Sequence, residues 1–344
     1  MASGVEHEVA RIEGAARLDL VADIGGTHSR FALSDPDAPD VALLAPRTLR
    51  NAGFDRFEDA IAHYLDGVPQ RPARAALAVA CPVEGDEVRL TNRHWTFRRS
   101  ALSQRFGFTA LEVLNDFGAI AWAVPALGTR HLVHIAGPRR EPLQGPVSLV
   151  GPGTGLGVAL LAGSPVTDGV VVETEGGHAS FAPLDETGRA LEAHLRALHG
   201  RVSIERVLSG DGLARLEAVL RRRAQDGGDV AVRDPAQVGA DALSGRDPLA
   251  RAAVLRWFAL LGSVAGDIAL LQGARTLLMA GGIVPRYLDL LRASAFHARF
   301  LEKGRLSGWL QEVDMRVVTH PHPGLLGAAR RLRLGRGGDH DLRS

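Results

Sequence analysis

Two parts of the chain share one pattern of apolar and polar positions. Near the N-terminus, apolar β-rich runs at 18–23 and 29–34 enclose a short glycine turn. The same order returns in the middle of the chain, where strands are predicted at 147–150 and 157–162 around a second glycine-rich turn, with another at 169–172. Such runs, interrupted by Gly and Thr, are typical of strands joined by a tight turn. The repetition indicates a duplicated architecture.

The rest of the chain alternates between buried strands and helices. Short continuous apolar runs predict buried strands at 75–81, 111–114 and 276–280. Ser100 is expected to cap the first of the helices that follow the strand at 75–81. The spacing of apolar residues predicts helices at 54–66, 101–106, 117–124, 187–198, 204–208 and 210–223.

A long helix is predicted at 248–272. A row of small and apolar side chains along it favours close packing against another helix. The row consists of Ala252, Leu255, Ala259, Gly262 and Gly266. The polar, Gly- and Asp-rich stretch at 225–245 before it is expected to be a surface excursion with one short helix.

This order of elements predicts an α/β protein of two domains with a cleft between them. The length of 344 residues also suits two domains better than one core. We expect a small domain at 18–125, completed by about 320–335, and a large domain at 126–319. Flexible segments are expected at 1–17 and 336–344.

Composition narrows the class of protein. The formal net charge of +1 argues against a general nucleic-acid or acidic-membrane surface. The single cysteine, Cys81, excludes an internal disulfide and a cysteine-built metal site. The pattern indicates no stretch long and apolar enough to span a bilayer and no signal-peptide core, so we expect a cytoplasmic protein without a membrane partner.

The first glycine turn follows the strand at 18–23 and has the sequence Asp23-Ile24-Gly25-Gly26-Thr27. Glycines permit close contact between backbone N–H groups and anionic oxygens. An aspartate at the strand end is suited to a hydrated Mg²⁺, and the threonine hydroxyl is suited to a phosphate oxygen. An ordinary Gly-Gly hairpin turn is the alternative.

The second turn lies in the segment Gly151-Pro152-Gly153-Thr154-Gly155-Leu156-Gly157. Its glycine spacing does not fit a dinucleotide fingerprint, and the chain contains no GxxxxGK[ST] phosphate loop. Two hairpin turns of this kind are suited to holding the phosphates of one nucleotide from both sides. The pair is more informative than either turn alone.

A possible proton acceptor lies at a strand-to-helix junction. Asn115-Asp116 follows the predicted strand at 111–114, at a position where active-site carboxylates of α/β proteins often lie. Asp116 is suited to accept a proton from an attacking hydroxyl. It would serve equally well as the N-cap of the next helix, and the two roles are compatible.

Carboxylates and an imidazole gather in a second place. Glu175-Gly176-Gly177-His178 puts charged and titratable groups around two glycines, and sugar hydroxyls are suitable partners for them. A metal site is the weaker rival, because the Glu and His flank a Gly-Gly turn instead of sharing a helix face. A solvated loop is the third possibility. Glu205 alone would be an ordinary surface carboxylate, and Gly281-Gly282 alone would be an ordinary strand–helix connection.

Taken in order, these segments resemble bacterial glucokinase over about residues 18–333. The resemblance rests on six motifs, which are DIGGT…RFAL from Asp23, LNDF from Leu114, GPGTGLG from Gly151, EGGH…FAP from Glu175, ERVLSG from Glu205 and AGGIVPR from Ala280. It implies a two-domain hexokinase/actin-like ATPase fold (ribonuclease H-like) and transfer of the ATP γ-phosphoryl to the 6-hydroxyl of D-glucose.

The resemblance also implies roles for individual residues. The first phosphate-contacting turn would consist of Ala22, Asp23, Ile24, Gly25, Gly26 and Thr27, and the second would include Thr154 and Gly155. Asp23 would position Mg²⁺ through water, and Gly281 and Gly282 would border the adenosine. The substrate-binding set would be Asn115, Asp116, Gly155, Glu175, His178 and Glu205, with Asp116 also acting as general base.

Some residues depart from the family pattern, and some functions stay open. Position 28 is His where many members carry Asn, while Pro152 and Asp211 replace smaller or apolar loop residues. The acceptor sugar is glucose in this interpretation, with mannose, glucosamine or another hexose as alternatives. A non-catalytic sugar sensor on a kinase scaffold is the alternative from another class. A homodimer is common in the resembled family.

Overall fold

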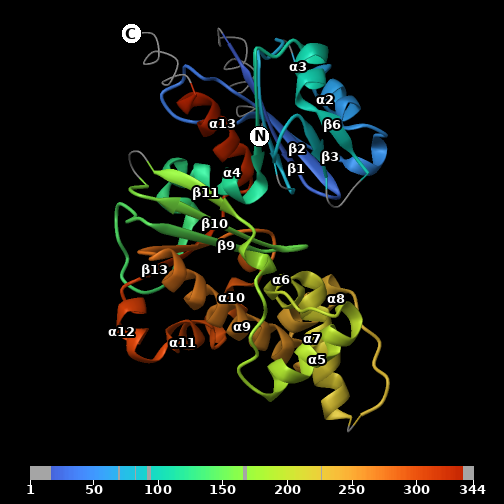
Figure 1. The fold of residues 1–344 in the computed structure, drawn as a ribbon, viewed down its shortest axis with the longest axis vertical. Helices are drawn as coiled ribbons and strands as arrows, with labels where there is room; N and C mark the ends of the chain where they lie inside the picture. The colour runs from blue at the N-terminus through green and yellow to red at the C-terminus, as the bar shows by residue number, and fades with distance from the viewer. Residues whose placement is uncertain are drawn as a thin grey trace. The chain divides into compact units, whose positions relative to one another are not determined.

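The computed structural model describes residues 17–335 except 69, 82, 91–93, 166–168 and 226. It divides into two compact units, one formed by Met1–Gly128 with His320–Ser344 and the other by Thr129–Thr319 (Figure 1). Residues 1–16 of the predicted N-terminal segment and the tail at 336–344 lie outside the described residues. The following paragraphs take each unit by itself.

The first unit is built on a five-stranded sheet in the order β3-β2-β1-β4-β7. β1, β2 and β3 are antiparallel neighbours, whereas β1, β4 and β7 run parallel. A separate two-stranded sheet joins β5 and β6. The strands are β1 (Asp19–Ile24), β2 (His28–Ser34), β3 (Leu44–Arg50), β4 (Arg74–Val79), β5 (Glu87–Arg89), β6 (Thr96–Arg98) and β7 (Ala110–Asn115).

Helices cover both faces of this sheet because side chains alternate along each strand. Leu20 of β1 packs in a cluster with α2, whereas its neighbour Val21 packs with α13 on the opposite face. The same alternation separates Phe31 from Ala32 on β2. The helices are α2 (Phe57–Leu65), α3 (Arg99–Phe106), α4 (Asp116–Ala123) and α13 (Pro323–Leu334).

The second unit is built on a six-stranded sheet in the order β11-β10-β9-β12-β13-β8. β9, β12 and β13 run parallel, and β10, β11 and β8 are antiparallel to their neighbours. The strands are β8 (Leu132–Ala136), β9 (Val147–Pro152), β10 (Leu156–Ala162), β11 (Val170–Thr174), β12 (Thr276–Met279) and β13 (Asp314–Val318).

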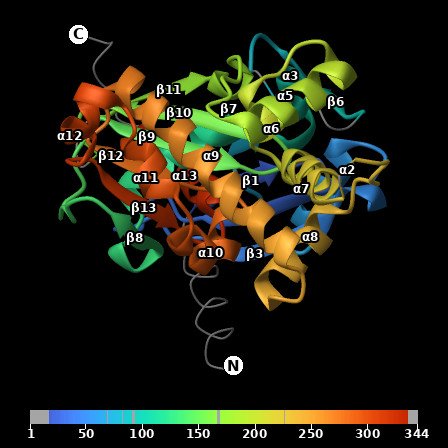
Figure 2. The same cartoon turned by 90° about the horizontal axis from the view of Figure 1, so that it is seen from below.

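The core of the second unit surrounds one long helix, α9 (Pro248–Gln272), which packs against α7, α8 and α11 (Figures 1 and 2). A Cβ added at Gly262 would lie 2.1 Å from the carbonyl oxygen of Phe296 on α11, so the predicted close helix packing is confirmed there. The other helices are α5 (Glu186–His199), α6 (Ile204–Val207), α7 (Gly210–Ala224), α8 (Pro235–Ser244), α10 (Leu288–Ala293), α11 (Phe296–Leu301) and α12 (Ser307–Leu310).

Two sequence predictions are wrong in detail. α9 is long and apolar enough for a bilayer span, contrary to the expectation that no stretch is, since an 18-residue window of it has a mean hydropathy of 1.6. Of this window, 72% is buried inside the second unit, which is typical of a core helix that is apolar on most sides. Ser100 does not cap α3: the helix begins at Arg99, two residues before the predicted start, and the Ser100 hydroxyl donates to Asp86 Oδ2 at 2.8 Å.

Candidate active site

In the first unit, the predicted turn and Asn115-Asp116 lie at one edge of the sheet. Because β1, β4 and β7 are parallel, their carboxyl ends meet at the same edge. The register pairs Asp23 with Ala78 and Ala78 with Leu114. Adjacent strands are about 4.8 Å apart, so Asp23 and Leu114 are separated by roughly 10 Å across the sheet.

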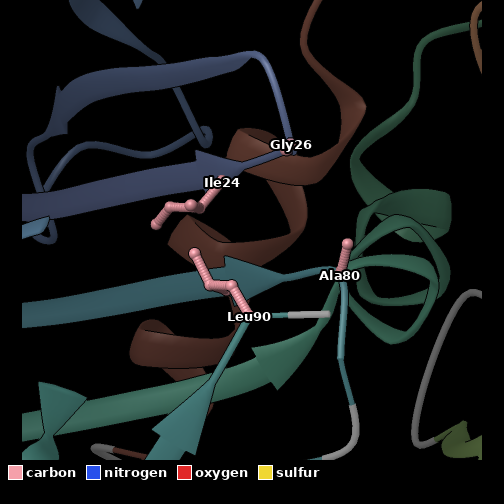
Figure 3. A pocket seen from close by; sticks show the side chains of 5 residues that line it. Ile24, Gly26, Ala80 and Leu90 are labelled. Atoms are coloured by element: carbon pink, nitrogen blue, oxygen red, sulfur yellow. The ribbon is translucent and has the colours of Figure 1, made fainter. Parts of the chain in front are cut away.

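The β1–β2 turn has the strand–turn–strand form predicted for it. Gly25 N donates to His28 O at 3.0 Å and closes the turn. The hydroxyl-bearing Thr27 at its tip is exposed. A small hollow lies beside the turn, with the side chains of Ile24 and Leu90 extending toward it from two strand ends (Figure 3). Its lining residues are Ile24, Gly25, Gly26, Ala80 and Leu90.

Asp23 lies at the end of β1, largely buried beside a cation and a helix start. Arg30 Nη1 is 3.2 Å from Asp23 Oδ2. Burial raises the pKa of Asp23, and the charges of Arg30 and His322 oppose that shift. α13 begins next to this carboxylate, since a Cβ at Gly324 would lie 3.2 Å from Asp23 Cγ. A helix N-terminus favours negative charge, so this position is prepared for an anion.

Asn115, and not Asp116, caps α4. Asn115 Oδ1 accepts hydrogen bonds from Phe117 N at 2.9 Å and Gly118 N at 3.1 Å. Asp116 is the first residue of the helix, and its Oδ1 accepts from Phe117 N at 2.9 Å. The cap alternative for Asp116 is therefore wrong by one residue. Because Asn115 holds the helix start, the Asp116 carboxylate is not required for capping.

In the second unit, the β9–β10 turn and Gly281 are neighbours. Gly153 N donates to Gly155 O at 2.8 Å within the turn. β12 lies parallel to β9, and Ala280 N donates to Val150 O at 3.0 Å just before Gly281. Gly281 has φ +89°, and a Cβ there would lie 3.0 Å from Pro152 O. A glycine is favoured at this point because of both the positive φ and the close backbone.

Glu175 and His178 flank a turn that lies flat on β10. A Cβ at Gly177 would lie 2.2 Å from Leu156 O, so only a glycine permits this approach. The side chains of Glu175 and His178 are each 59% exposed, and Glu175 Oε2 is 3.8 Å from His178 Nε2. Both side chains are accessible to a ligand.

Glu205 is connected to the β9–β10 turn. Its Oε2 accepts from Leu156 N at 3.0 Å. A Cβ at Gly155 would lie 2.3 Å from the same Oε2, so the carboxylate rests directly on Gly155. Gly210, five residues after Glu205 in the sequence, also contacts the turn, because Gly210 N donates to Gly153 O at 3.0 Å. The turn and the carboxylate are thus fixed together.

Arg201 is a further residue of this region that sequence patterns did not indicate. Its Nη2 donates to His178 O at 2.7 Å and to Ser180 Oγ at 3.2 Å. A backbone hydrogen bond also joins the segment at 201–204 to the residue after His178, because Ile204 N donates to Ala179 O at 2.9 Å. Arg201 therefore supports the Glu175–His178 turn, a role that depends on distant residues and has no local signal.

Comparison with known proteins identifies the family. The glucokinase family model matches residues 20–334. The chain belongs to the glucokinase family. A glucokinase from Chromohalobacter salexigens is 45% identical over 318 residues, covering 91% of this chain and 97% of its own. One from Chromobacterium violaceum is 42% identical over 316 residues, covering 91% and 88%.

A solved structure agrees with this assignment. The crystal structure of a glucokinase from an Antarctic psychrotroph has a TM-score of 0.80 and 37% identity, covering 92% of this chain and 99% of its own. The predicted α/β hexokinase/actin-like fold is confirmed. As a glucokinase-family enzyme, the chain is a kinase whose reaction is the ATP-dependent phosphorylation of glucose.

The predicted site residues form two groups, one in each unit. The first group lies at the β1, β4 and β7 edge, and the second lies around the β9–β10 turn. The groups are Ala22, Asp23, Ile24, Gly25, Gly26, Thr27, Asn115 and Asp116 in the first unit, and Thr154, Gly155, Glu175, His178, Glu205, Gly281 and Gly282 in the second. Within the described ranges, no group of three or more His, Cys, Asp or Glu side chains is arranged to hold a metal ion by itself.

Proposed function

We propose that Asp116 is the general base for transfer of the ATP γ-phosphoryl to the 6-hydroxyl of D-glucose. The observation that carries this proposal is the position of Asp116, at the same sheet edge as the β1–β2 turn and in the first turn of α4, which Asn115 caps. Asp116 accepts the 6-hydroxyl proton, the hydroxyl oxygen attacks the γ-phosphorus, and ADP leaves. Such a reaction depends on alignment and charge neutralisation more than on covalent work by the protein.

The two units contribute different contacts in this proposal. Backbone N–H groups of the two glycine turns hold the phosphates, and Gly281-Gly282 borders the adenosine. The glucose hydroxyls are held by Asn115, Asp116, Gly155, Glu175, His178 and Glu205. The fixed hydrogen bonds around Glu205 and Asn115 support this, because pre-set partners lose little freedom when a ligand binds.

Asp23 fits a magnesium ion bound through water. Mg²⁺ usually keeps several waters and needs only one or two carboxylates besides the substrate phosphates. The Asp23 carboxylate at the end of β1 supplies one such ligand. When bound, Mg²⁺ neutralises phosphate charge.

A coupled assay with a panel of hexoses and phosphoryl donors tests the proposal. The chain is expected to produce glucose 6-phosphate from glucose and ATP, and the coupling reaction reports this product as NADPH. A greater kcat/KM for mannose or glucosamine than for glucose would favour the alternative that the chain is a kinase of another hexose. Sugar binding without turnover for any hexose would favour the non-catalytic sensor.

Cellular setting and assembly follow from the family resemblance. We propose a cytoplasmic homodimer with glucose and ATP as partners and with no nucleic-acid or membrane partner. Light scattering of the purified full chain tests the dimer, because a mass of one chain across micromolar concentrations would contradict it.

Glu175→Gln is expected to weaken glucose binding roughly tenfold, because a charge-assisted hydrogen bond becomes a neutral one. Calorimetry with glucose measures the change. Glu173→Gln is the matched control, because Glu173 is an exposed carboxylate on β11, two residues earlier. Equal glucose affinity in Glu175→Gln and wild type would contradict the sugar-pocket assignment.

Gly155→Ala is expected to lower kcat/KM for glucose by about 10- to 100-fold while leaving the melting temperature nearly unchanged. The added methyl would meet Glu205 Oε2 at 2.3 Å, so the carboxylate has to move away from Leu156 N. The clash involves the end of a flexible side chain, so the backbone need not shift. If the effect acts through Glu205, Gly155→Ala adds little in a Glu205→Ala background, whereas full additivity would rule out this coupling.

A further inference from the structure

Asn51 holds the inner side of the β1–β2 turn. It begins a short 3₁₀ turn, Asn51–Gly53, directly after β3, and its side chain is completely buried. Asn51 Nδ2 donates to Gly25 O at 2.8 Å and to Gly26 O at 3.1 Å. Its backbone N donates to Thr27 O at 2.9 Å. One residue therefore binds three successive carbonyl oxygens of the turn.

Ser29 fixes the orientation of the Asn51 amide. Ser29 Oγ donates to Asn51 Oδ1 at 2.8 Å, and Ser29 is also fully buried. The hydroxyl can only donate to the oxygen end, so both Nδ2 hydrogens face the two glycine carbonyls. The arrangement needs a side chain with two donors and one acceptor, which an amide provides.

This arrangement determines where the N–H groups of the turn point. In a planar trans peptide, the carbonyl oxygen and the following N–H lie on opposite sides of the bond. With the Gly25 and Gly26 carbonyls directed at Asn51, the N–H groups of Gly26 and Thr27 point away from it. In the described part of the chain, neither N–H donates to a backbone carbonyl. Two adjacent N–H groups of this kind form a site for an anion.

We propose that Asn51 is a positioning residue for the phosphoryl donor. It holds the carbonyl side of the turn and thereby directs the Gly26 and Thr27 N–H groups at a nucleotide phosphate. This role rests on the proposed function of the β1–β2 turn as a phosphate-contacting turn. Asn51 itself does not touch the nucleotide.

The test measures KM for ATP and for glucose, kcat and melting temperature in full-length variants. Asn51→Asp places an acceptor oxygen against two carbonyls, and Asn51→Leu removes the side-chain hydrogen bonds to Gly25 O, Gly26 O and Ser29 Oγ. Both are expected to raise KM for ATP roughly tenfold or more, with less than a twofold change in KM for glucose. Tyr64→Phe is the matched control, because it removes a hydrogen bond from a buried side chain to Ala45 O (3.0 Å) in the same unit.

A merely structural role predicts a different result. If Asn51 only stabilises the fold, its variants lower the melting temperature as Tyr64→Phe does and leave KM for ATP unchanged, which would overturn the proposal. If the Asn51 variants do not fold, Ser29→Ala decides, because it removes only the hydroxyl that orients the amide. A severalfold rise in KM for ATP is expected for Ser29→Ala, and no rise would overturn the proposal.

Failure of the proposed reaction is distinguishable from failure of this inference. A wild-type chain that phosphorylates no hexose would contradict the proposed function alone. The thermal shift produced by ATP then measures nucleotide binding directly. Loss of that shift in the Asn51 variants, with retention in Tyr64→Phe, would support the positioning role, and an equal shift in all variants would overturn it.

Discussion

Replacing Asp116 by asparagine is expected to lower kcat by about 10²–10⁴ while leaving glucose affinity comparatively intact. The amide keeps the shape of the side chain and an oxygen that can accept from Phe117 N, as Asp116 Oδ1 does at 2.9 Å. It does not accept a proton from an attacking hydroxyl. The helix start is preserved because Asn115 caps α4. The substitution is therefore expected to slow the chemical step. Steady-state kinetics measures the fall in kcat, and calorimetry measures the affinity for glucose separately.

The matched control is another aspartate in the first turn of a helix. Asp59 lies in the first turn of α2, and its pair with Arg105 is on the surface. Asp59→Asn is expected to retain wild-type kcat, which separates loss of the base from a general loss of charge at helix starts. Near-normal turnover by Asp116→Asn would remove Asp116 from the role of general base.

The two hairpins and the long helix could be predicted because their signals are local. The β1–β2 and β9–β10 hairpins were both predicted from glycine turns between β-rich runs, and both are antiparallel pairs in the structure. α9 has the predicted bounds because its apolar pattern is long and ends at Gly273, which has φ +64°. Local patterns of this kind do not depend on what the segment meets in the fold.

Other parts depend on contacts between distant residues. Asn51 acts on a turn about 25 residues earlier in the chain, and nothing in its local sequence indicates this. The start of α4 was misassigned because Asn115 and Asp116 are both good capping residues, and only the backbone conformation decides between them. β3 was not predicted because most of its residues are exposed and lack an alternating pattern.

The strand β13 was missed for a different physical reason, which is a buried ion pair. Its sequence, Asp314-Met315-Arg316-Val317-Val318, has two charges at positions that share one face of a strand. From the sequence, two charged side chains on one face predict an exposed segment, yet both side chains are fully buried in the structure. Arg316 Nη2 is 2.7 Å from Asp314 Oδ2, so each charge has a partner.

This buried pair also binds the loop before β9. Arg140 N donates to Asp314 Oδ2 at 2.9 Å, and Arg316 Nη1 donates to Glu141 Oε1 at 2.8 Å. Arg316 Nη2 donates to the Arg140 carbonyl as well. The pair therefore connects β13 to a segment more than 170 positions earlier in the chain.

Asp314→Ala is expected to lower the free energy of unfolding by about 3–5 kcal/mol, because it leaves the Arg316 charge buried without its main partner. Urea unfolding of the full chain, followed by fluorescence, measures the loss as a lower midpoint. The double variant Asp314→Leu with Arg316→Met is expected to recover only part of it, because it leaves no buried charge but still removes the acceptor of Arg140 N. Asp289→Ala on α10 is the exposed control, since its pair with Arg292 is on the surface and contributes little. An unchanged midpoint in Asp314→Ala would mean that the pair does not stabilise the second unit.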